Sequence, residues 1–578
     1  MDDATSPQGG FSSVPAAGQP QSHSLSRPLR QQGGLARLLY TNNPFYLISA
    51  WLVFSGLRVS FDSGGEMFET WALIGGLAGY ALLAAVAAGV LIRLGRVWED
   101  IRTLVLLVLL MFLAIAVSLD EALVKDARRG AWFLIGGLIF AASLSECLLL
   151  VLRVRLPFLY RVPYHLLLAL FFVYPILLAP LVPQPNNAAL QWGLFGFSSV
   201  AAAIFLMLLP AIRRGAVYLR GNGTPWGWPW YPLTLFFILA IAVALRAYYL
   251  CLSLHFVGNA WTIFGGYFVV PLLIALDILW LEIGLVSGRK IAVRCALAAP
   301  VAWVALAQAG RPSDDVYAGF LSLFVQTMHG SPLYLALVAA LVFYGVAALR
   351  RAPTAVAGWW LTIACLTVIG PQTLTLRGPY HLTAWPLMLG GAALVWQAFR
   401  QRASLPAALA AAAWLGAASI DTRTADWLLG FRELLPLELA ALALLAIGIA
   451  FRDERVNLIR AAAAALIVAA GVSAVTGNFA WSIASDWLFT GLHALAWTAV
   501  AWAYGRWLRH RYYYGVAAAV SAVWLVAASV QLYLSLRPFV AGLDRLVCGL
   551  AFFLAALIIS ILKARGSGRR LVPGAEAG

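Results

Sequence analysis

The sequence predicts an all-α, polytopic integral membrane protein, and three observations support this fold class. Of the 578 residues, 62% are hydrophobic and only 11% are charged, whereas about 25% of the residues of a soluble domain are charged. The apolar residues form runs close to the length of about 20 residues with which a helix crosses a bilayer. Arginines concentrate in every second loop between these runs. This composition excludes an ordinary soluble enzyme.

The two ends of the chain differ from its apolar middle. Residues 1–43 are predicted to form a disordered cytoplasmic tail, because residues 1–33 are rich in Gly, Pro, Ser and Gln and contain no apolar run. This segment also lacks the short apolar core of a signal peptide. Residues 44–562 are predicted to form the transmembrane helical domain, and residues 563–578 a short basic cytoplasmic tail.

Within the apolar middle we expect about 16–18 membrane-spanning helices, each formed by an apolar run of about 17–25 residues. The Ala-rich runs 404–420 and 457–475 are the weakest candidates, since alanine contributes little to membrane partitioning. The candidate runs are 44–61, 70–92, 103–119, 131–152, 163–182, 189–212, 232–255, 261–286, 291–309, 332–349, 356–376, 380–399, 404–420, 434–451, 457–475, 487–504, 512–533 and 540–562.

The loops between these runs are short, and their basic residues indicate the orientation. If the N-terminus is cytoplasmic, most of the 40 lysines and arginines fall in inner loops, as the positive-inside rule requires. This asymmetry holds to the last loop, so both termini are predicted to be cytoplasmic. The preference for Arg over Lys, with abundant Ala, is typical of a GC-rich bacterial genome and indicates an inner (cell) membrane. The expected partner is therefore the lipid bilayer and not nucleic acid.

Four charged side chains lie well inside predicted spans, where each costs at least about 2.5–3.5 kcal/mol near the bilayer centre. They are Glu146, Arg246, Asp277 and Glu282. Arg246 and Asp277 lie on two arms of a hairpin with an axial offset of about 7–8 Å, which predicts an ion pair that either lines a cavity or simply neutralises two charges. The three acids are candidates for ion or proton handling. Asp277 and Glu282 project about 140° apart on one helix.

An acidic loop, DSGGEMFE at residues 62–69, follows the first predicted span on the outer side. Its Asp62, Glu66 and Glu69 are candidates for a second site. The loop resembles the acidic first outer loop of polytopic glycosyltransferases that use lipid-linked sugar donors, and this resemblance implies a transferase site around the three carboxylates. The likeness covers these residues alone, and those enzymes usually carry a much larger folded loop there. The simpler interpretation is an acidic outer loop that obeys the topology.

Two further segments are predicted to lie at the membrane surfaces. The inner loop VYLRGNGTPWGWPWYP places Trp226, Trp228 and Trp230 among Gly and Pro. These indoles either anchor the chain among lipid headgroups or grip a substrate or partner. On the outer side, the apolar residues of 316–328 follow helical spacing, which predicts an amphipathic helix on the membrane surface.

The motif content predicts no metal site and no cofactor, because the cysteines and histidines lack metal-ligand spacing. Walker A, GxSxG and Rossmann sequences are absent from suitable contexts, so ATP-driven transport and hydrolysis lack support. Three function classes stay open. A secondary transporter or flippase for a small-molecule, ion or lipid substrate is favoured by many spans, short loops and a few buried charges. The others are a membrane-embedded transferase acting on a lipid-linked substrate and a non-catalytic membrane scaffold.

Overall fold

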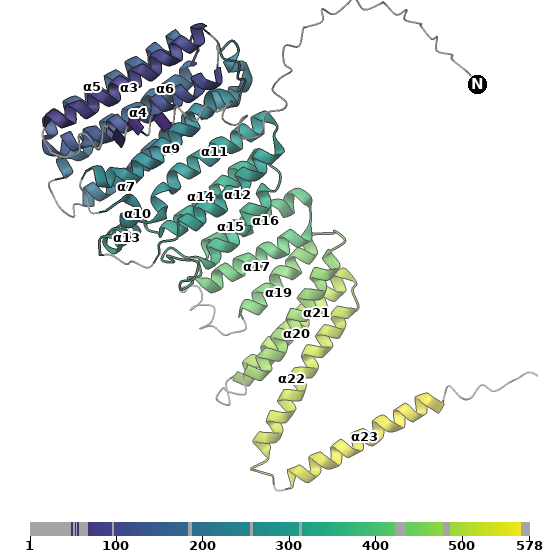
Figure 1. The fold of residues 1–578 in the computed structure, drawn as a ribbon. Helices are drawn as coiled ribbons and strands as arrows, with labels where there is room; N and C mark the ends of the chain where they lie inside the picture. Colours follow the sequence, from purple (N-terminus) through teal and green to yellow (C-terminus); the bar gives the residue numbers. More distant parts are fainter. Residues whose placement is uncertain are drawn as a thin grey trace, which may run out of the picture. The chain divides into compact units, whose positions relative to one another are not determined.

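The described parts of the chain consist of helices and the turns between them (Figure 1), which confirms the predicted all-α membrane fold. The computed structural model describes residues 48–49, 52–53, 55–56, 67–94, 98–182, 188–254, 258–310, 315–421, 435–477, 486–540 and 542–567. In these ranges, 11 helices are long and apolar enough to cross a membrane, and Ala355–Val368, Ser404–Ile420 and Leu435–Ala450 are shorter apolar helices. Most of the predicted run 44–61 lies outside the described residues. The total of about 16–18 spans therefore stays a prediction.

The chain divides into two units, residues 1–296 with 314–320 and residues 297–313 with 321–578. The first unit contains α3 (Met67–Leu94), α4 (Trp98–Lys125), α5 (Ala127–Val151), α6 (Phe158–Leu178), η2 (Ala179–Leu181), α7 (Ala188–Leu206), α8 (Leu209–Arg214), η3 (Gly215–Leu219), α9 (Trp230–Ser253), α10 (Ala260–Phe264), η4 (Gly266–Val269) and α11 (Val270–Ser287).

Two helices, α12 (Lys290–Leu306) and α13 (Asp315–Met328), contribute residues to both units. The second unit continues with α14 (Pro332–Leu349), α15 (Ala355–Val368), α16 (Trp385–Gln401), α17 (Ser404–Ile420), α19 (Leu435–Ala450), α20 (Val456–Gly477), α21 (Asp486–Leu508), α22 (Tyr512–Leu536) and α23 (Leu543–Ser567).

In the first unit, α4 forms antiparallel hairpins with α3 and α5 and also packs on α9. The turn between α4 and α5 is tight, since Asp126 caps α5 by accepting the backbone N–H groups of Arg128 and Arg129 at 3.1 and 3.2 Å. Just beyond it, Gly130 faces the backbone of Leu123, where an added Cβ would lie 2.2 Å from the Leu123 Cα. The close approach of the two helices therefore requires glycine at this position.

Two predicted runs are interrupted by the backbone. Run 261–286 divides into α10 and α11, because Gly265 adopts a φ of +70° that ends α10. Run 356–376 contains only α15, since the chain leaves the helix at Ile369, just before Gly370 and Pro371. Glycine and proline thus shorten helices that hydropathy alone predicts to be longer.

The helix predicted at 316–328 is present as α13. Its Tyr317 and Phe320 are buried, and the Phe320 ring lies 4.7 Å from that of Phe264 and 5.6 Å from that of Phe195 between centroids. This part of the apolar face therefore packs on aromatic side chains of the first unit. Its position at a membrane surface stays a prediction.

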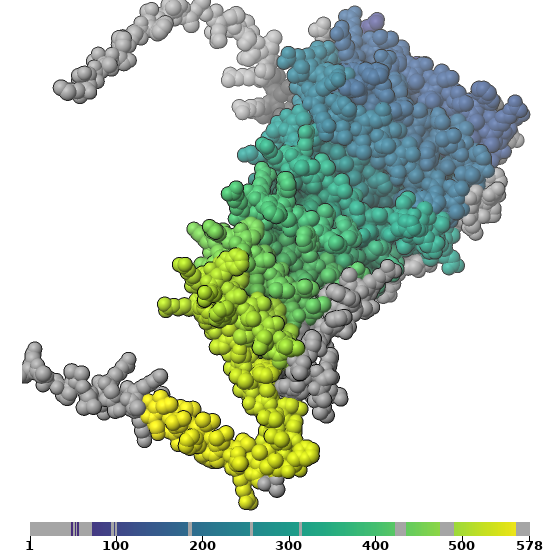
Figure 2. All heavy atoms as spheres, turned by 180° about the vertical axis from the view of Figure 1, so that it is seen from behind, coloured from purple at the N-terminus to yellow at the C-terminus, as the bar shows by residue number. Residues whose placement is uncertain are grey.

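The second unit has two apolar cores among its described residues. One lies within α19 to α22 and includes Leu445, Ile467 and Val520. The other joins α14 and α15 and includes Leu337 and Ile363. In α23, by contrast, no residue of the most apolar stretch is buried (Figure 2). An apolar helix without protein cover is what a lipid environment tolerates, since lipid tails are as apolar as leucine.

Candidate functional site

The loop between η3 and α9 folds against the turn that joins α5 to α6. Arg155 donates its backbone N–H to the Asn222 carbonyl at 2.9 Å, and Tyr231 donates its hydroxyl to the Arg155 carbonyl at 3.0 Å. Asn222 also shapes the loop itself, because its Oδ1 accepts the Thr224 N–H at 2.9 Å. These bonds bring the residues after η3 and the start of α9 to the same end of the unit as the α5–α6 turn.

Gly223 lies at the closest approach between this loop and the α5–α6 turn. Its φ is +82°, and an added Cβ would lie 2.3 Å from the Arg153 carbonyl oxygen. Glycine adopts positive φ without steric cost and has no Cβ, so it meets both requirements at once. The glycine-rich composition of the loop thus has a structural cause at this position.

The two segments enclose a cleft of about 460 Å³, which we call the basic cleft. Arg155, Arg161 and Arg220 line it, and its one acidic lining residue is Glu146. Neither Arg155 nor Arg220 forms an ion pair with any described side chain. Planar guanidinium groups bind phosphate and carboxylate through paired N–H donors, so the cleft is suited to an anion. The other lining residues are Leu149, Leu150, Val154, Leu156, Pro157, Tyr218, Leu219 and Asn222.

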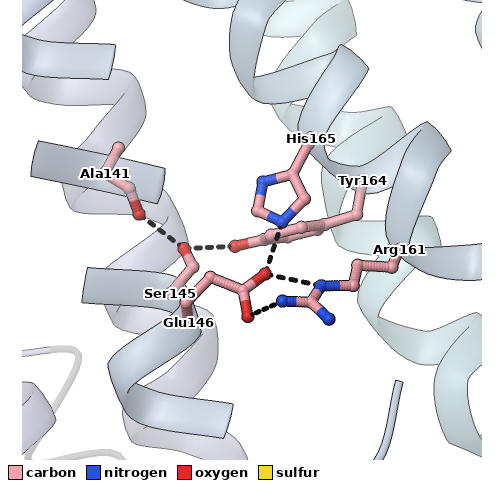
Figure 3. A network of polar contacts seen from close by, with 6 residues as sticks. All are labelled: Ala141, Ser145, Glu146, Arg161, Tyr164 and His165. Atoms are coloured by element: carbon pink, nitrogen blue, oxygen red, sulfur yellow. Dashed lines mark hydrogen bonds and ion pairs between the residues drawn. The ribbon is translucent and has the colours of Figure 1, made fainter. Parts of the chain in front are cut away.

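Glu146 holds Arg161 at the edge of the basic cleft (Figure 3). Arg161 donates through Nε to Glu146 Oε1 at 2.7 Å and through Nη2 to Oε2, and His165 Nε2 lies 2.6 Å from the same Oε1. Beside this network, the hydroxyls of Ser145 and Tyr164 hydrogen-bond at 2.7 Å. The predicted intramembrane candidate Glu146 therefore lies near the end of α5, where it orients an arginine of the basic cleft.

A second cleft of about 370 Å³ adjoins the basic one, and we call it the apolar cleft. Trp226 and Trp230 of the tryptophan-rich loop line it, together with Trp98 at the start of α4. The Trp98 and Trp226 rings contact each other edge to face, with centroids 5.8 Å apart. Three residues, Leu149, Val154 and Leu156, line both clefts. Two of the three predicted loop indoles thus form the wall of a cleft.

The predicted ion pair between Arg246 and Asp277 is wrong. Arg246 instead pairs with Asp120 of α4, donating through Nη2 to Oδ1 at 2.8 Å and through Nη1 to Oδ2. The Phe171 carbonyl of α6 accepts a further bond from Nη2 at 3.3 Å. Arg246 and Asp120 are both 0% exposed. Counting residues along the hairpin predicts how far along its helix each residue lies, but not the direction in which its side chain points. The orientation of α9 about its own axis turns Arg246 toward α4.

Asp277 lies inside α11 without a cationic partner among the described residues. Its side chain is 7% exposed, and its Oδ2 is buried without a hydrogen-bond partner. Glu282 differs, because it pairs with Arg213 of α8 through a 2.8 Å contact between Nε and Oε1. The two acids therefore have different surroundings, in keeping with their angular separation on one helix.

The remaining candidates do not form a site in the part of the chain that is described. Asp62 and Glu66 lie outside the described residues, and only the backbone of Glu69, at the start of α3, is described. In the second unit, Glu438 contacts His493. Among the described residues, no group of three or more His, Cys, Asp or Glu side chains is arranged to hold a metal ion.

Sequence reasoning missed the basic cleft because it treated the inner arginines only as topology signals. One signal was present: Arg155 and Arg161 lie in one inner loop, Arg220 lies in the next, and the tryptophan-rich loop follows directly. Neighbouring inner loops of a helical hairpin series lie at one membrane face, which brings such residues within reach of each other. Sequence reasoning also missed Asp120, which follows the predicted run 103–119 but lies within α4.

The fold defines the chain as a multi-pass α-helical membrane protein, and its first unit carries a basic cleft that adjoins an aromatic, apolar one. No protein-family model, no curated protein and no solved structure matches the chain. The chemistry of these clefts and of the buried charges is therefore the basis for inferring a function.

Proposed function

We propose that this protein is a secondary transporter or flippase that binds an anionic substrate in the basic cleft. The clustering of Arg155, Arg161 and Arg220 around one cleft of about 460 Å³ carries the proposal. A cleft of this volume falls within the range of about 300–1,000 Å³ that is typical of small-molecule sites. Two of the arginines have no carboxylate partner among the described residues, so their charge is available to a ligand.

The two alternative classes have less support. The carboxylates of Asp62, Glu66 and Glu69, which a transferase site would need, are not among the side chains that the structure describes, so no observation favours this class. A scaffold does not require three arginines around a cleft of ligand size. We also propose that the protein lies in the inner membrane of a bacterium with both termini in the cytoplasm, because most basic residues then fall in inner loops. The basic cleft then opens on the cytoplasmic side.

Removing the two unpaired arginines is expected to weaken both binding and transport of an anion. In proteoliposomes, wild-type protein should accelerate the movement of glycerol phosphate or oleoyl lysophosphatidic acid across the bilayer. Arg155→Gln combined with Arg220→Gln should lower the affinity at least about 10-fold, since a hydrogen bond to a charged group contributes about 1.5–3 kcal/mol. Binding by titration and transport by probe flux are the measurements.

Arg128→Gln combined with Arg129→Gln is the matched control, because it removes the same two charges from exposed positions at the opposite end of α5. It should bind and transport as wild type does. If well-folded wild-type protein moves neither probe, the transport proposal is wrong. If this control lowers the affinity as much as Arg155→Gln with Arg220→Gln does, the effect belongs to overall charge and not to the basic cleft.

We propose that Asp277 couples transport to a proton or cation gradient. A buried carboxyl inside a helix without a basic partner is the type of group that proton relays of membrane proteins use. Asp277→Asn should keep the fold and abolish the stimulation of transport by an imposed gradient, whereas Glu282→Gln should reduce it much less because Glu282 pairs with the exposed Arg213. Probe flux with and without a pH gradient tests this. Full stimulation in Asp277→Asn contradicts the assignment.

A further inference from the structure

The apolar cleft is the feature that the proposed anion site leaves unexplained. It has about 370 Å³ of space, and apart from Arg102, Thr224 and Thr234 its lining is aliphatic or aromatic. An anion alone gains little from the aliphatic and aromatic part of this surface. A ligand that carries both an anionic group and a hydrocarbon chain has a use for both clefts, which lie side by side because Leu149, Val154 and Leu156 line both of them.

Two contacts link residues that line the clefts. Tyr231 lines the apolar cleft, and its hydroxyl donates to the backbone carbonyl of Arg155, which lines the basic cleft. On the other wall, Trp226 packs edge to face against Trp98. Indole and phenol rings, with an apolar body and a polar tip, are the side chains that membrane proteins place at the level of lipid headgroups.

We infer that the two clefts form one site for an anionic phospholipid, whose phosphate group lies among Arg155, Arg161 and Arg220 and whose acyl chain lies in the apolar cleft. This inference adopts from the proposed function the binding of an anion in the basic cleft, and it names the class of that anion. The charge of the lining favours the choice, since three arginines face one carboxylate that is itself bound to Arg161. A neutral lipid satisfies only the apolar cleft, and a soluble phosphate only the basic cleft.

Three probes separate these possibilities in binding experiments on the purified full-length protein. Oleoyl lysophosphatidic acid carries the chain and the phosphate, glycerol phosphate carries the phosphate alone, and monooleoylglycerol carries the chain alone. A lipid also partitions into detergent micelles, so matched variants decide the result. Leu106→Phe and Leu235→Phe narrow the apolar cleft from two helices. Leu233→Phe makes the same change at a residue of α9 that lines a neighbouring groove beside Trp280 and Ile283 and does not line the apolar cleft.

Leu106→Phe and Leu235→Phe are each expected to lower the affinity for lysophosphatidic acid about 10-fold and to leave the affinity for glycerol phosphate unchanged. Leu233→Phe should bind both probes as wild type does. Arg220→Gln should lower the affinity for both lysophosphatidic acid and glycerol phosphate. Monooleoylglycerol should bind wild type at least about 10-fold more weakly than lysophosphatidic acid does. Size-exclusion profiles and melting temperatures identify a variant that fails to fold, and the second narrowing variant then decides. Unchanged lysophosphatidic acid binding in a folded narrowing variant overturns the inference, as does monooleoylglycerol binding equal to that of lysophosphatidic acid. If the protein binds lysophosphatidic acid through its acyl chain but moves no probe across the bilayer, the transport proposal is wrong and the lipid site stands.

Discussion

Arg246→Met is expected to lower the free energy of unfolding by about 3–5 kcal/mol, which is the cost of breaking a buried ion pair by removing one partner. Arg246 and Asp120 are both 0% exposed, and Arg246 also donates to the carbonyl of Phe171. The variant leaves the Asp120 carboxylate buried without its two donors. Because the pair joins α4, α6 and α9, the loss should appear as cooperative destabilisation in denaturant titrations of the detergent-solubilised protein.

A double substitution tests whether the two residues act as a pair. Arg246→Met with Asp120→Leu replaces both charges by apolar side chains of similar size, and such replacements of buried pairs are often neutral or stabilising. The double variant should therefore be more stable than Arg246→Met alone. By contrast, Arg246→Met and Asp277→Asn should show additive effects, since these residues share no contact. If adding Asp120→Leu to Arg246→Met does not restore stability and adding Asp277→Asn does, the assignment of the Arg246–Asp120 pair is wrong.

The fold class could be predicted from the sequence because membrane insertion depends on local quantities. A helix in lipid satisfies its backbone within itself, so a single apolar run carries nearly all the necessary information. The runs 70–92 and 512–533 accordingly appear as α3 and α22. Hydropathy was less informative where the backbone departs from the helix, as at Gly265 and at Gly370. Those departures depend on turn geometry and not on apolar content.

The partners of the buried charges could not be predicted in the same way. Sequence spacing gives the height of a residue along its helix, but the neighbour that it faces depends on how three or more helices pack. Arg246 and Asp120 are 126 positions apart, and nothing local connects them. The basic cleft was missed for a related reason, because its lining comes from the end of α5, the turn after it, the start of α6, and η3 with the loop that follows.

Gly223→Ala is expected to abolish measurable binding of glycerol phosphate or to weaken it at least about 10-fold. Alanine at a φ of +82° costs about 1–2 kcal/mol in the left-handed region. In addition, its Cβ would meet the Arg153 carbonyl oxygen at 2.3 Å. The loop must therefore move away from the α5–α6 turn. That movement breaks the Arg155–Asn222 bond and separates Arg220 from the other two arginines of the basic cleft.

Two other glycines of the same loop provide graded controls. Gly221 has a φ of +71° with no atom within 4 Å of an added Cβ, so Gly221→Ala introduces backbone strain without the clash. Gly227 has neither positive φ nor a close neighbour. Gly227→Ala should therefore bind glycerol phosphate as wild type does, Gly221→Ala should bind it more weakly, and Gly223→Ala should bind it most weakly. If Gly223→Ala binds glycerol phosphate as Gly227→Ala does, the contact between the loop and the α5–α6 turn does not form the anion site. The three arginines then act independently of it.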